Sequence, residues 1–367
     1  MLFELDMETP GIVIDPLLDG ASTLHESISS ESLELSQYVR NAQHALIDRL
    51  DAYTDIINIE IGDTSLIRAR NFEREFDLKQ IWLKFEGNNP SGTQKDRIAF
   101  AQCLDALRRE YDTITLATCG NYGAAISLAA NLAGLRCLVC IPETYHTERV
   151  REMEAQGAHI IRTPGKYEDA VWYSRKLAET EGYYDANPGG SNSAIQIIAY
   201  AEIANEIYDV LRDAPKIVAV PVSNGTLLAG IYRGFASLYK RGKTSRIPRF
   251  VAASSYKKNP IIYSFKKGLE TCVNIEEDKI KESRINEPLI NWHSFDGNEA
   301  LWALNQTQGE AFDISDHKMM QYSRQLKQKE GLHVLPASTV GLAALLEMHK
   351  ADRLEGDRYV VILTGRH

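Results

Sequence analysis

From about residue 56 onward, short apolar runs alternate with longer segments in which apolar and polar positions are mixed. The short runs are rich in β-branched residues, a composition that favours strands buried on both faces. They fall at residues 81–83, 113–118, 135–142, 160–164, 216–222, 249–254 and 359–365. We therefore expect a strand at each of these runs.

The longer segments carry apolar residues at helical spacing, which predicts amphipathic helices that cover a sheet. They fall at residues 97–111, 121–134, 149–157, 167–182, 195–211, 225–242, 315–331 and 336–353. Strands that alternate with helices predict an α/β fold with mostly parallel sheets. The chain has 367 residues, which is enough for two such domains at roughly 100–200 residues per domain.

Two parts of the chain do not follow this alternation. Residues 1–55 have a polar, loop-like start and then a helical pattern over residues 36–50, so we interpret them as an N-terminal extension. Residues 255–300 are rich in Lys, Asn and Ser, which predicts loops over one face of the fold. The rest contains no internal repeat and no low-complexity tract.

The charge balance argues against two classes of partner. The formal net charge is −9, which favours neither nucleic acid nor an anionic membrane surface. No apolar run reaches the roughly 20 residues that a membrane-spanning helix needs. The N-terminus carries acids where a secretion signal needs bases. We therefore expect a cytoplasmic protein that binds no nucleic acid and no membrane.

The cysteines give no sign of a disulfide framework or a metal site. Five of them, an odd and sparse set, are typical of a reducing compartment: Cys103, Cys119, Cys137, Cys140 and Cys272. Cys137 and Cys140 have C-x-x-C spacing, but in a strand residues three apart point to opposite faces. No cluster of His and Cys has zinc spacing, so we predict no metal.

Unusual residues follow four of the strands, where ligands of open α/β sheets bind. The first is KFEGNNPSGTQKDR at residues 84–97, a turn-rich loop that leads into a helix from about Asp96. Lys95 therefore meets the positive end of a helix dipole, which favours its neutral amine. A neutral lysine can form a Schiff base with an aldehyde. The alternative is a solvated loop lysine.

The second stretch is Thr118-Cys119-Gly120-Asn121, which joins a buried strand to a helix. Glycine lets a ligand approach the backbone, and the free N–H groups of a helix start form an anion site that suits a carboxylate. Asn121 could reach a phenolic oxygen. The alternative is a tight strand–helix turn without a ligand.

The third stretch, Ser223-Asn224-Gly225-Thr226, also follows a strand and begins a helix, and its small residues suit a phosphate group. It lacks both the P-loop lysine spacing and the G-x-G-x-x-G pattern of nucleotide sites. The fourth stretch lies after the last strand, where Thr364 could offer a neutral hydroxyl to a ring nitrogen.

In this order, the four stretches resemble the fold-type II pyridoxal-phosphate enzymes, and among them the threonine synthases most closely. NPSGTQKDR is similar to their N-P-[TS]-G-S-[FH]-K-D-R, and the stretch at residues 118–134 is similar to their S-G-N-containing turn and helix. The segments IGDTSL, EPLINWHSF and VVILTG also have counterparts. The resemblance extends from about Gly62 to the C-terminus.

The resemblance implies an architecture of two three-layer α/β domains with mostly parallel sheets, as in the tryptophan synthase β subunit. The larger, cofactor-binding domain would comprise residues 56–95 and 206–367. The smaller domain, residues 96–205, would be mobile and close over a small amino-acid substrate. The resemblance also suggests a homodimer.

The resemblance also implies a role for each stretch. Lys95 would bind pyridoxal 5′-phosphate covalently and act as acid and base on the substrate. Asn121 would contact the cofactor's 3-hydroxyl and Thr364 its ring nitrogen. The phosphate would lie on Ser223, Asn224, Gly225 and Thr226, and the substrate carboxylate on Thr118, Cys119 and Gly120.

The implied reaction is β- or γ-elimination or replacement, with threonine synthesis from O-phosphohomoserine as the first candidate. Two departures from the sequence pattern of the threonine synthases argue against that substrate. Ser223 replaces the first glycine of the phosphate loop, and NPGGSNSAIQ at residues 187–196 lacks the family's lysine. The alternatives are β-replacement or elimination on serine, threonine, O-phosphoserine or O-acetylserine, and a non-catalytic ligand-binding relative. Arg97, Arg149 and Arg151 are either anion anchors, with Arg97 in the substrate site, or surface helix residues.

Overall fold

The computed structural model describes residues 27–118, 120–145, 149–354, 356 and 358–367. Its first sheet has the strand order β1-β2-β10-β7-β8-β9, and only the β1–β2 pair is antiparallel. These strands are β1 (Leu66–Arg68), β2 (Ile81–Phe85), β7 (Ile217–Pro221), β8 (Arg249–Ser255), β9 (Glu310–Ile314) and β10 (Tyr359–Leu363). Every residue of β7 and β10 is buried, as expected for central strands covered on both faces.

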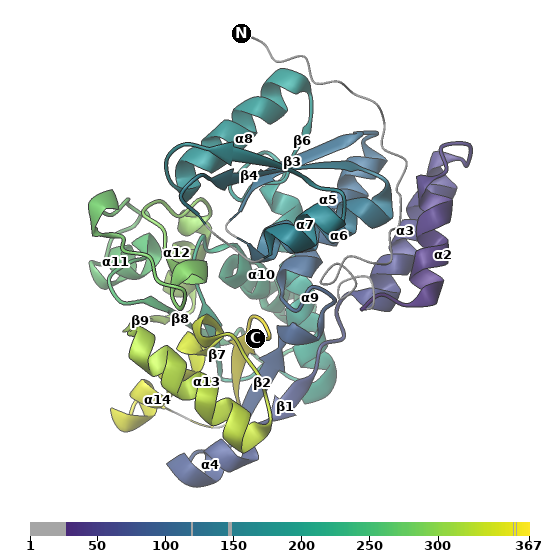
Figure 1. The fold of residues 1–367 in the computed structure, drawn as a ribbon. Coiled ribbons are helices and arrows are strands. Elements are labelled where there is room, and N and C mark those ends of the chain that lie inside the picture. Colours follow the sequence, from purple (N-terminus) through teal and green to yellow (C-terminus); the bar gives the residue numbers. More distant parts are fainter. Residues whose placement is uncertain (1–26, 119, 146–148, 355, 357) are drawn as a thin grey trace.

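The second sheet is wholly parallel and has the order β5-β4-β3-β6 (Figure 1). Its strands are β3 (Thr113–Ala117), β4 (Arg136–Pro142), β5 (His159–Thr163) and β6 (Tyr184–Asp185). The two mostly parallel sheets confirm the predicted α/β class. Strands β1, β6 and β9 were not expected from the sequence; β1 and β6 span only three and two residues, and most of β9 is only half-buried.

Helices cover both faces of each sheet. In the larger sheet, Val218 and Val220 belong to an apolar cluster with α9 and α10, whereas Ile217 and Ala219 belong to a cluster with α14. The first cluster continues through α5 and α6 to the smaller sheet, and α8 packs on that sheet's other face. The helices are α4 (Arg70–Phe76), α5 (Lys95–Arg108), α6 (Asn121–Ala133), α7 (Val150–Ala155), α8 (Tyr167–Glu181), α9 (Ser193–Leu211), α10 (Thr226–Lys240), α11 (Pro260–Lys266), α12 (Gly297–Gln306), α13 (Asp316–Glu330) and α14 (Val340–Lys350).

The described part of the N-terminal extension forms a helical hairpin beside the smaller sheet (Figure 1). The predicted single helix over residues 36–50 is wrong, because α2 (Ser30–Arg40) ends before a turn and α3 (Leu46–Glu60) follows it. The Asn41 side chain accepts a hydrogen bond from the Gln43 N–H (3.0 Å), which stabilises the turn. Tyr53 on α3 donates to the Ala129 carbonyl at 2.9 Å and so fixes the hairpin on α6.

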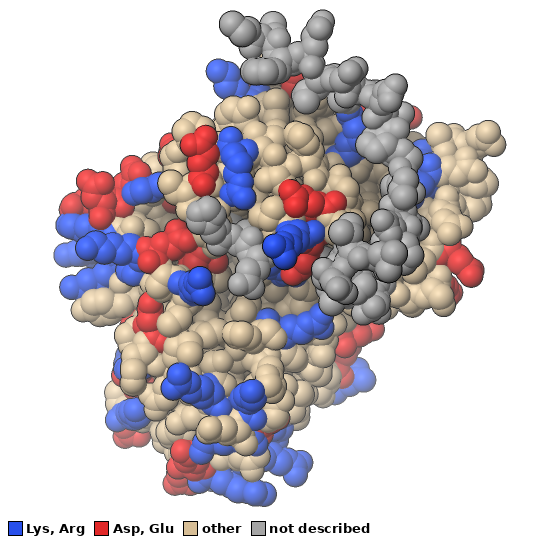
Figure 2. All heavy atoms as spheres, viewed as in Figure 1, with Lys and Arg blue, Asp and Glu red and all other residues tan. Residues whose placement is uncertain are grey.

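The described residues contain no helix that is long and apolar enough to cross a membrane. On the face shown in Figure 2, basic and acidic side chains are interspersed rather than gathered into regions of one sign. This distribution agrees with a chain whose charges interact mainly with solvent and with one another.

Candidate active site

A cavity of about 330 Å³ opens where the carboxyl ends of strands from both sheets face each other. The segments after β3, β7 and β10 contribute to its wall, as does the start of α5. The predicted residues that line it are Lys95, Thr118, Gly120, Asn121, Ser223, Asn224, Gly225, Thr226 and Thr364. Four stretches that lie far apart in the sequence are therefore brought to one cavity. Cys119 lies outside the described residues.

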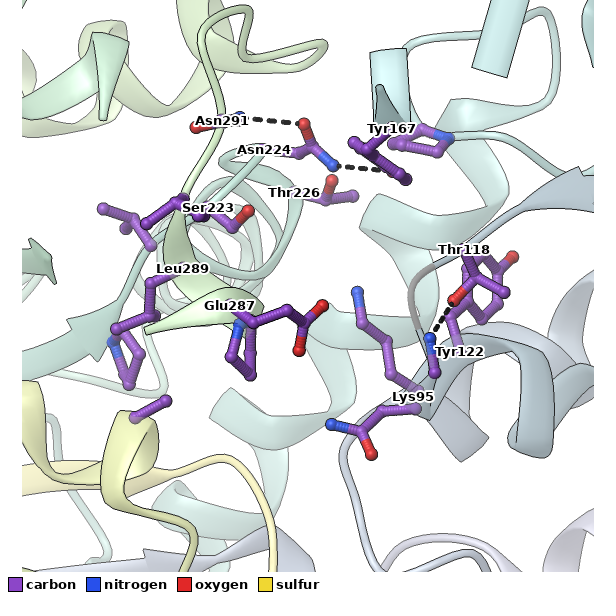
Figure 3. Close-up of a pocket in the computed structure, with 18 of the residues that line it drawn as sticks. Lys95, Thr118, Tyr122, Tyr167, Ser223, Asn224, Thr226, Glu287, Leu289 and Asn291 are labelled. Atoms are coloured by element: carbon purple, nitrogen blue, oxygen red, sulfur yellow. Dashed lines mark hydrogen bonds between the residues drawn. The ribbon is translucent and has the colours of Figure 1, made fainter. Parts of the chain in front are cut away.

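Lys95 is the first residue of α5, and its side chain extends into the cavity near Glu287 (Figure 3). Burial lowers the pKa of Lys95 to about 8, although the carboxylates of Asp296 and Glu287 act in the opposite direction. The Tyr122 ring lies beside the amine, with 5.4 Å between Nζ and the ring centroid. The sequence predicted a lowered pKa from the helix dipole, but burial is the larger cause.

Backbone hydrogen bonds hold the lysine loop against the end of β10. The Gln94 N–H donates to the Thr364 carbonyl (3.0 Å), and Thr93 pairs with Gly365 in an isolated antiparallel bridge. The Thr364 hydroxyl shares a 2.9 Å hydrogen bond with the hydroxyl of Ser338, which is fully buried. Lys95 and an uncharged hydroxyl therefore occupy fixed positions in the same cavity.

The turn before α6 depends on a glycine. Gly120 has φ of 153° and ψ of −80°, a conformation that residues with a side chain rarely adopt. The Thr118 hydroxyl accepts hydrogen bonds from the N–H groups of Gly120 (3.1 Å) and Gly123 (3.2 Å), which fixes the turn. Asn121 then begins the helix, and its Oδ1 accepts a 2.8 Å hydrogen bond from Arg149.

The start of α10 is a second place where backbone N–H groups face the cavity. Gly225 has φ of +98°, and no side chain in the described part of the chain caps the N–H groups of this 15-residue helix. An anion would be stabilised here by the free N–H groups and the helix dipole. Asn224 is held on both sides, because its Oδ1 accepts from Asn291 (3.1 Å) and its Nδ2 donates to the Tyr167 hydroxyl (3.2 Å) (Figure 3).

The Thr226 hydroxyl is already engaged by an acid. It donates to Asp296 at 2.5 Å. Burial raises the pKa of Asp296 to about 6, although the hydrogen bond from Thr226 opposes this change. The start of α10 therefore presents backbone N–H groups to the cavity, while the charge of Asp296 behind it depends on pH.

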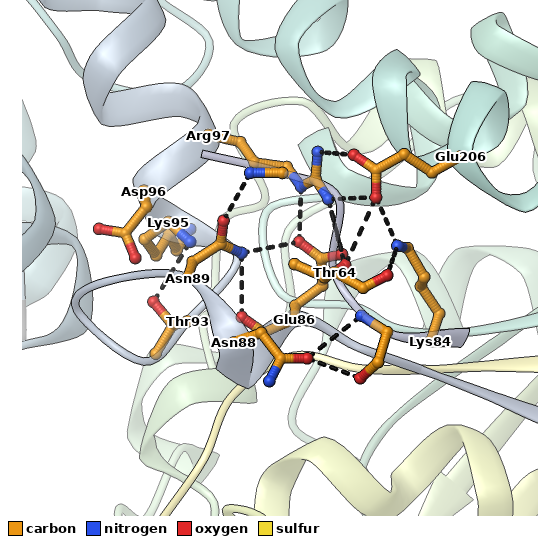
Figure 4. Close-up of polar contacts among 12 residues, drawn as sticks. Thr64, Lys84, Glu86, Asn88, Asn89, Thr93, Lys95, Asp96, Arg97 and Glu206 are labelled. Carbon is orange, nitrogen blue, oxygen red and sulfur yellow. Dashed lines mark hydrogen bonds and ion pairs between the residues drawn. The ribbon is translucent and has the colours of Figure 1, made fainter. Parts of the chain in front are cut away.

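Arg97 does not line the cavity and is not a surface residue, so both sequence-based expectations for it are corrected. It is buried and forms double hydrogen bonds with Glu86 (2.6 and 3.0 Å) and with Glu206 (2.6 and 2.9 Å). Lys84, which is also buried, pairs with Glu206 and with the Thr64 carbonyl (Figure 4). Two cations and two carboxylates thus neutralise one another behind the loop that carries Lys95.

Several cavity residues were given no role from the sequence: Tyr122, Tyr167, Glu168, Glu282, Glu287 and Trp292. Tyr122 and Glu287 lie in stretches that the resemblance already covered, TCGNYG and EPLINWHSF. Tyr167, Glu168 and Glu282 carry no local signal, because loops and helices distant in the sequence bring them to the cavity.

The sequence as a whole matches one known protein family. The profile of the pyridoxal-phosphate dependent enzymes matches residues 57–365. The chain belongs to this family. Its cofactor is therefore pyridoxal 5′-phosphate.

Curated members of the family include similar threonine synthases. The protein of Methanocaldococcus jannaschii is 26% identical over 316 residues, which cover 85% of this chain and 76% of that protein. The protein of Bacillus sp. (strain ULM1) is 28% identical over 331 residues, which cover 88% of each chain.

Solved structures of the family share the fold. Maize serine racemase has a TM-score of 0.72 at 19% identity, with 87% of this chain and 93% of that chain covered. O-ureido-L-serine synthase has a TM-score of 0.67 at 22% identity, with 84% and 91% covered. At these identities the likeness establishes the architecture and not the reaction.

The cavity fits this cofactor. An aldehyde reacts with a neutral amine, and lowering the pKa of Lys95 to about 8 raises the neutral fraction near physiological pH. A phosphate needs free N–H donors, which the uncapped start of α10 provides. A pyridine ring needs a flat space between the two, and the cavity is continuous from Lys95 to Thr226 and Thr364.

Proposed function

We propose that this enzyme catalyses elimination or replacement at the β or γ carbon of a small amino acid, with pyridoxal phosphate bound to Lys95. The observation that carries the proposal is the meeting of a low-pKa lysine, two helix starts and a neutral threonine hydroxyl in one cavity. These groups match, one for one, the needs of the cofactor and of a substrate carboxylate.

Each residue has one task in this proposal. The N–H groups at the start of α10 hold the cofactor phosphate, and Asn121 donates to its phenolic oxygen. Thr118 and Gly120 shape the start of α6, whose N–H groups bind the substrate carboxylate. The Lys95 amine takes a proton from one substrate carbon and returns it to another, a step worth about 10²–10⁴-fold.

When bound, pyridoxal phosphate supplies an electron sink for negative charge at the substrate's α-carbon. Thr364 tunes the reaction because its hydroxyl is uncharged and shares a hydrogen bond with Ser338. A hydroxyl stabilises a protonated ring nitrogen less than a carboxylate does, which disfavours transamination and leaves elimination and replacement.

The charges in the cavity wall favour a substrate without a phosphate group. Among the described residues of the wall, the cations are Lys95 and Lys166, and Lys166 pairs with Glu277 (3.0 Å). Three acids, Glu168, Glu282 and Glu287, line the same wall. After the cofactor phosphate has occupied the start of α10, a second phosphate would face this negative wall. Serine, threonine or O-acetylserine therefore fits better than O-phosphohomoserine.

Threonine synthase activity remains the second candidate, because the similar curated relatives carry that name. The two candidates are separated by offering O-phosphohomoserine and, in parallel, serine, threonine and O-acetylserine to the purified enzyme. Phosphate release from O-phosphohomoserine at a higher kcat/KM than turnover of the others would reject the unphosphorylated substrates.

The same assay tests the broader proposal. Lys95→Ala abolishes turnover of every substrate, since it removes the amine, and Lys166→Ala, which changes another lysine of the wall, retains it. A wild-type protein that binds pyridoxal phosphate but converts none of a wide set of amino acids would instead be a non-catalytic relative.

A further inference from the structure

Arg149 connects two elements of the active site. It precedes α7 and is about one-fifth exposed. Its Nη1 donates to Asn121 Oδ1 at 2.8 Å, and its Nη2 donates to the Ser91 carbonyl at 2.9 Å. Ser91 belongs to the loop that carries Lys95, and Asn121 begins α6. One guanidinium group therefore contacts both cofactor-facing elements.

The contact fixes which end of the Asn121 amide points into the cavity. A guanidinium group only donates hydrogen bonds, so the amide must present its oxygen to Arg149. Asn121 lines the cavity, and within the described part of the chain its Nδ2 has no hydrogen-bond partner. The amide N–H groups are thus left available to a ligand.

The guanidinium group adds no net charge to this position. Glu152 accepts hydrogen bonds from Arg149 Nε (3.0 Å) and Nη2 (2.8 Å). The pair as a whole is neutral, so its effect on a ligand passes through the orientation of the amide. A hydrogen bond to a cation also polarises the amide, which strengthens the Nδ2 donors.

The same group is coupled to the lysine loop through Ser91. The buried carboxylate of Asp96, next to Lys95, accepts hydrogen bonds from the Ser91 N–H and hydroxyl, both at 2.9 Å. Arg149 binds the carbonyl of the same residue. The distance between the Lys95 loop and the start of α6 is therefore set by a chain of side-chain hydrogen bonds.

We propose that Arg149 is a positioning residue that orients Asn121 so that its N–H, and not its carbonyl, meets the anionic phenolic oxygen of the cofactor. This inference rests on the role proposed for Asn121. It replaces the sequence-based alternatives for Arg149, which were an anchor for a substrate anion and a surface helix residue.

The test compares Arg149→Met with Arg151→Met, a matched control that removes an exposed arginine from α7. The measured quantities are the Kd of the apoprotein for pyridoxal phosphate and the ratio of the visible to the near-ultraviolet absorbance band of the bound cofactor. We expect Arg149→Met to raise the Kd roughly 10-fold and to lower the ratio, because a phenolate loses its donor. Arg151→Met changes neither quantity.

A double-mutant cycle distinguishes positioning from a general structural role. Because Arg149 acts through Asn121, Arg149→Met has little further effect on the Kd and the band ratio in an Asn121→Ala background. Full additivity in the cycle would overturn the inference. So would an unchanged Kd and band ratio in folded Arg149→Met together with a raised substrate KM, the result expected of a substrate anchor.

Arg149→Lys keeps the inference testable if the methionine variant does not fold. A lysine can donate to Asn121 but lacks the planar fork that also reaches Ser91 and Glu152, so a Kd between those of the wild type and Asn121→Ala is expected; a Kd and band ratio as poor as those of Asn121→Ala would overturn the inference. A wild-type protein with no Lys95-dependent cofactor band would instead reject the proposed function itself.

Discussion

At the scale of single residues, the chemistry of the site depends on an amine that loses its proton more readily than an ordinary lysine. Burial lowers the pKa of Lys95 from 10.5 to about 8, and this change outweighs the opposing charges of Asp296 and Glu287. Above about pH 8 the amine is mostly neutral and can attack an aldehyde.

The rate at which the apoprotein captures pyridoxal phosphate should therefore rise with pH and level off above about pH 8. Stopped-flow measurement of the visible absorbance band would follow this rate from pH 6 to 10. Lys166→Ala should give the same profile, because this lysine lies at the cavity wall in an ion pair. A rate that still climbs steeply beyond pH 10 would contradict the lowered pKa.

Asn121→Ala should reduce catalysis far more than folding. Loss of one hydrogen bond to a charged group predicts a roughly 10- to 100-fold fall in kcat/KM, against about 1 kcal/mol in the free energy of unfolding. Asn131→Ala, on the same helix, removes hydrogen bonds remote from the cavity and should spare kcat/KM. Loss of cooperative unfolding in Asn121→Ala would show that the residue serves the fold instead.

At the scale of elements, the buried charges behind the lysine loop join β2, α5 and α9. Lys84 lies in β2 and Glu86 directly follows that strand, whereas Arg97 lies in α5 and Glu206 in α9; mutual hydrogen bonds hold the four together. Burial alone would raise the pKa of Glu206, but the hydrogen bonds and charges of Arg97 and Lys84 lower it to about 2. Glu206 therefore remains ionised in the folded protein even in acid.

Removal of one carboxylate would leave Arg97 and Lys84 without their full complement of negative charge. We expect Glu206→Gln to lower the free energy of unfolding by about 3–5 kcal/mol near pH 7. Urea denaturation would measure it. Glu202→Gln, on the same helix but exposed, is the control and should change stability little.

Glu206 also affects how the free energy of unfolding changes at acid pH. The pKa of Glu206 is lowered from 4.5 to about 2 in the folded state, so its stabilisation is complete above about pH 4.5 and is lost as the pH falls towards 2. The wild type should lose more stability across this range than Glu206→Gln does. Parallel curves for the two proteins would contradict the role given to Glu206.

The strands and helices that the sequence predicted share one property: their apolar residues recur at the spacing of a strand or a helix and are buried. Strands such as β7 and β10 are apolar throughout, and the helices between them have apolar positions at helical spacing. By contrast, β9 is an edge strand with acids at Glu310 and Asp313, so neither alternation nor an apolar run reveals it. Tertiary pairing with β8 makes it a strand.

The sequence predicted those residues of the candidate site that lie within one recognisable stretch of the chain. Lys95, Asn121 and Thr364 each follow a strand and lie in a recognisable stretch, and the structure brings them to one cavity. The role of Arg97 was not predictable, because its partners Glu86 and Glu206 lie 11 and 109 residues away along the chain. The contact between Arg149 and Asn121 crosses 28 residues and was missed for the same reason.

At the scale of the whole molecule, the cavity lies between two sheets whose helices share a continuous apolar core. The proposed boundaries at residues 55 and 205 fall inside α3 and α9, whereas the boundary at 95 falls at the start of α5. That residues 96–205 move as a unit remains a prediction, as does the homodimer.

If the smaller unit closes over the substrate, binding should slow hydrogen–deuterium exchange on both sides of the cavity. The segments after β3 and around Glu287 are expected to respond together, because they face one another across it. The exposed surface of α13, which contributes no residue to the cavity lining, serves as the internal control. Protection confined to one side would favour a rigid site that binds without closure.

Lys95 is the residue proposed to carry the cofactor. Borohydride reduction of the enzyme with bound pyridoxal phosphate, followed by peptide mass mapping, tests this proposal most directly. One phosphopyridoxyl group is expected on the peptide that contains Lys95, and none is expected in Lys95→Ala. A label on Lys166 or on another lysine, with Lys95 unmodified, would contradict the proposal.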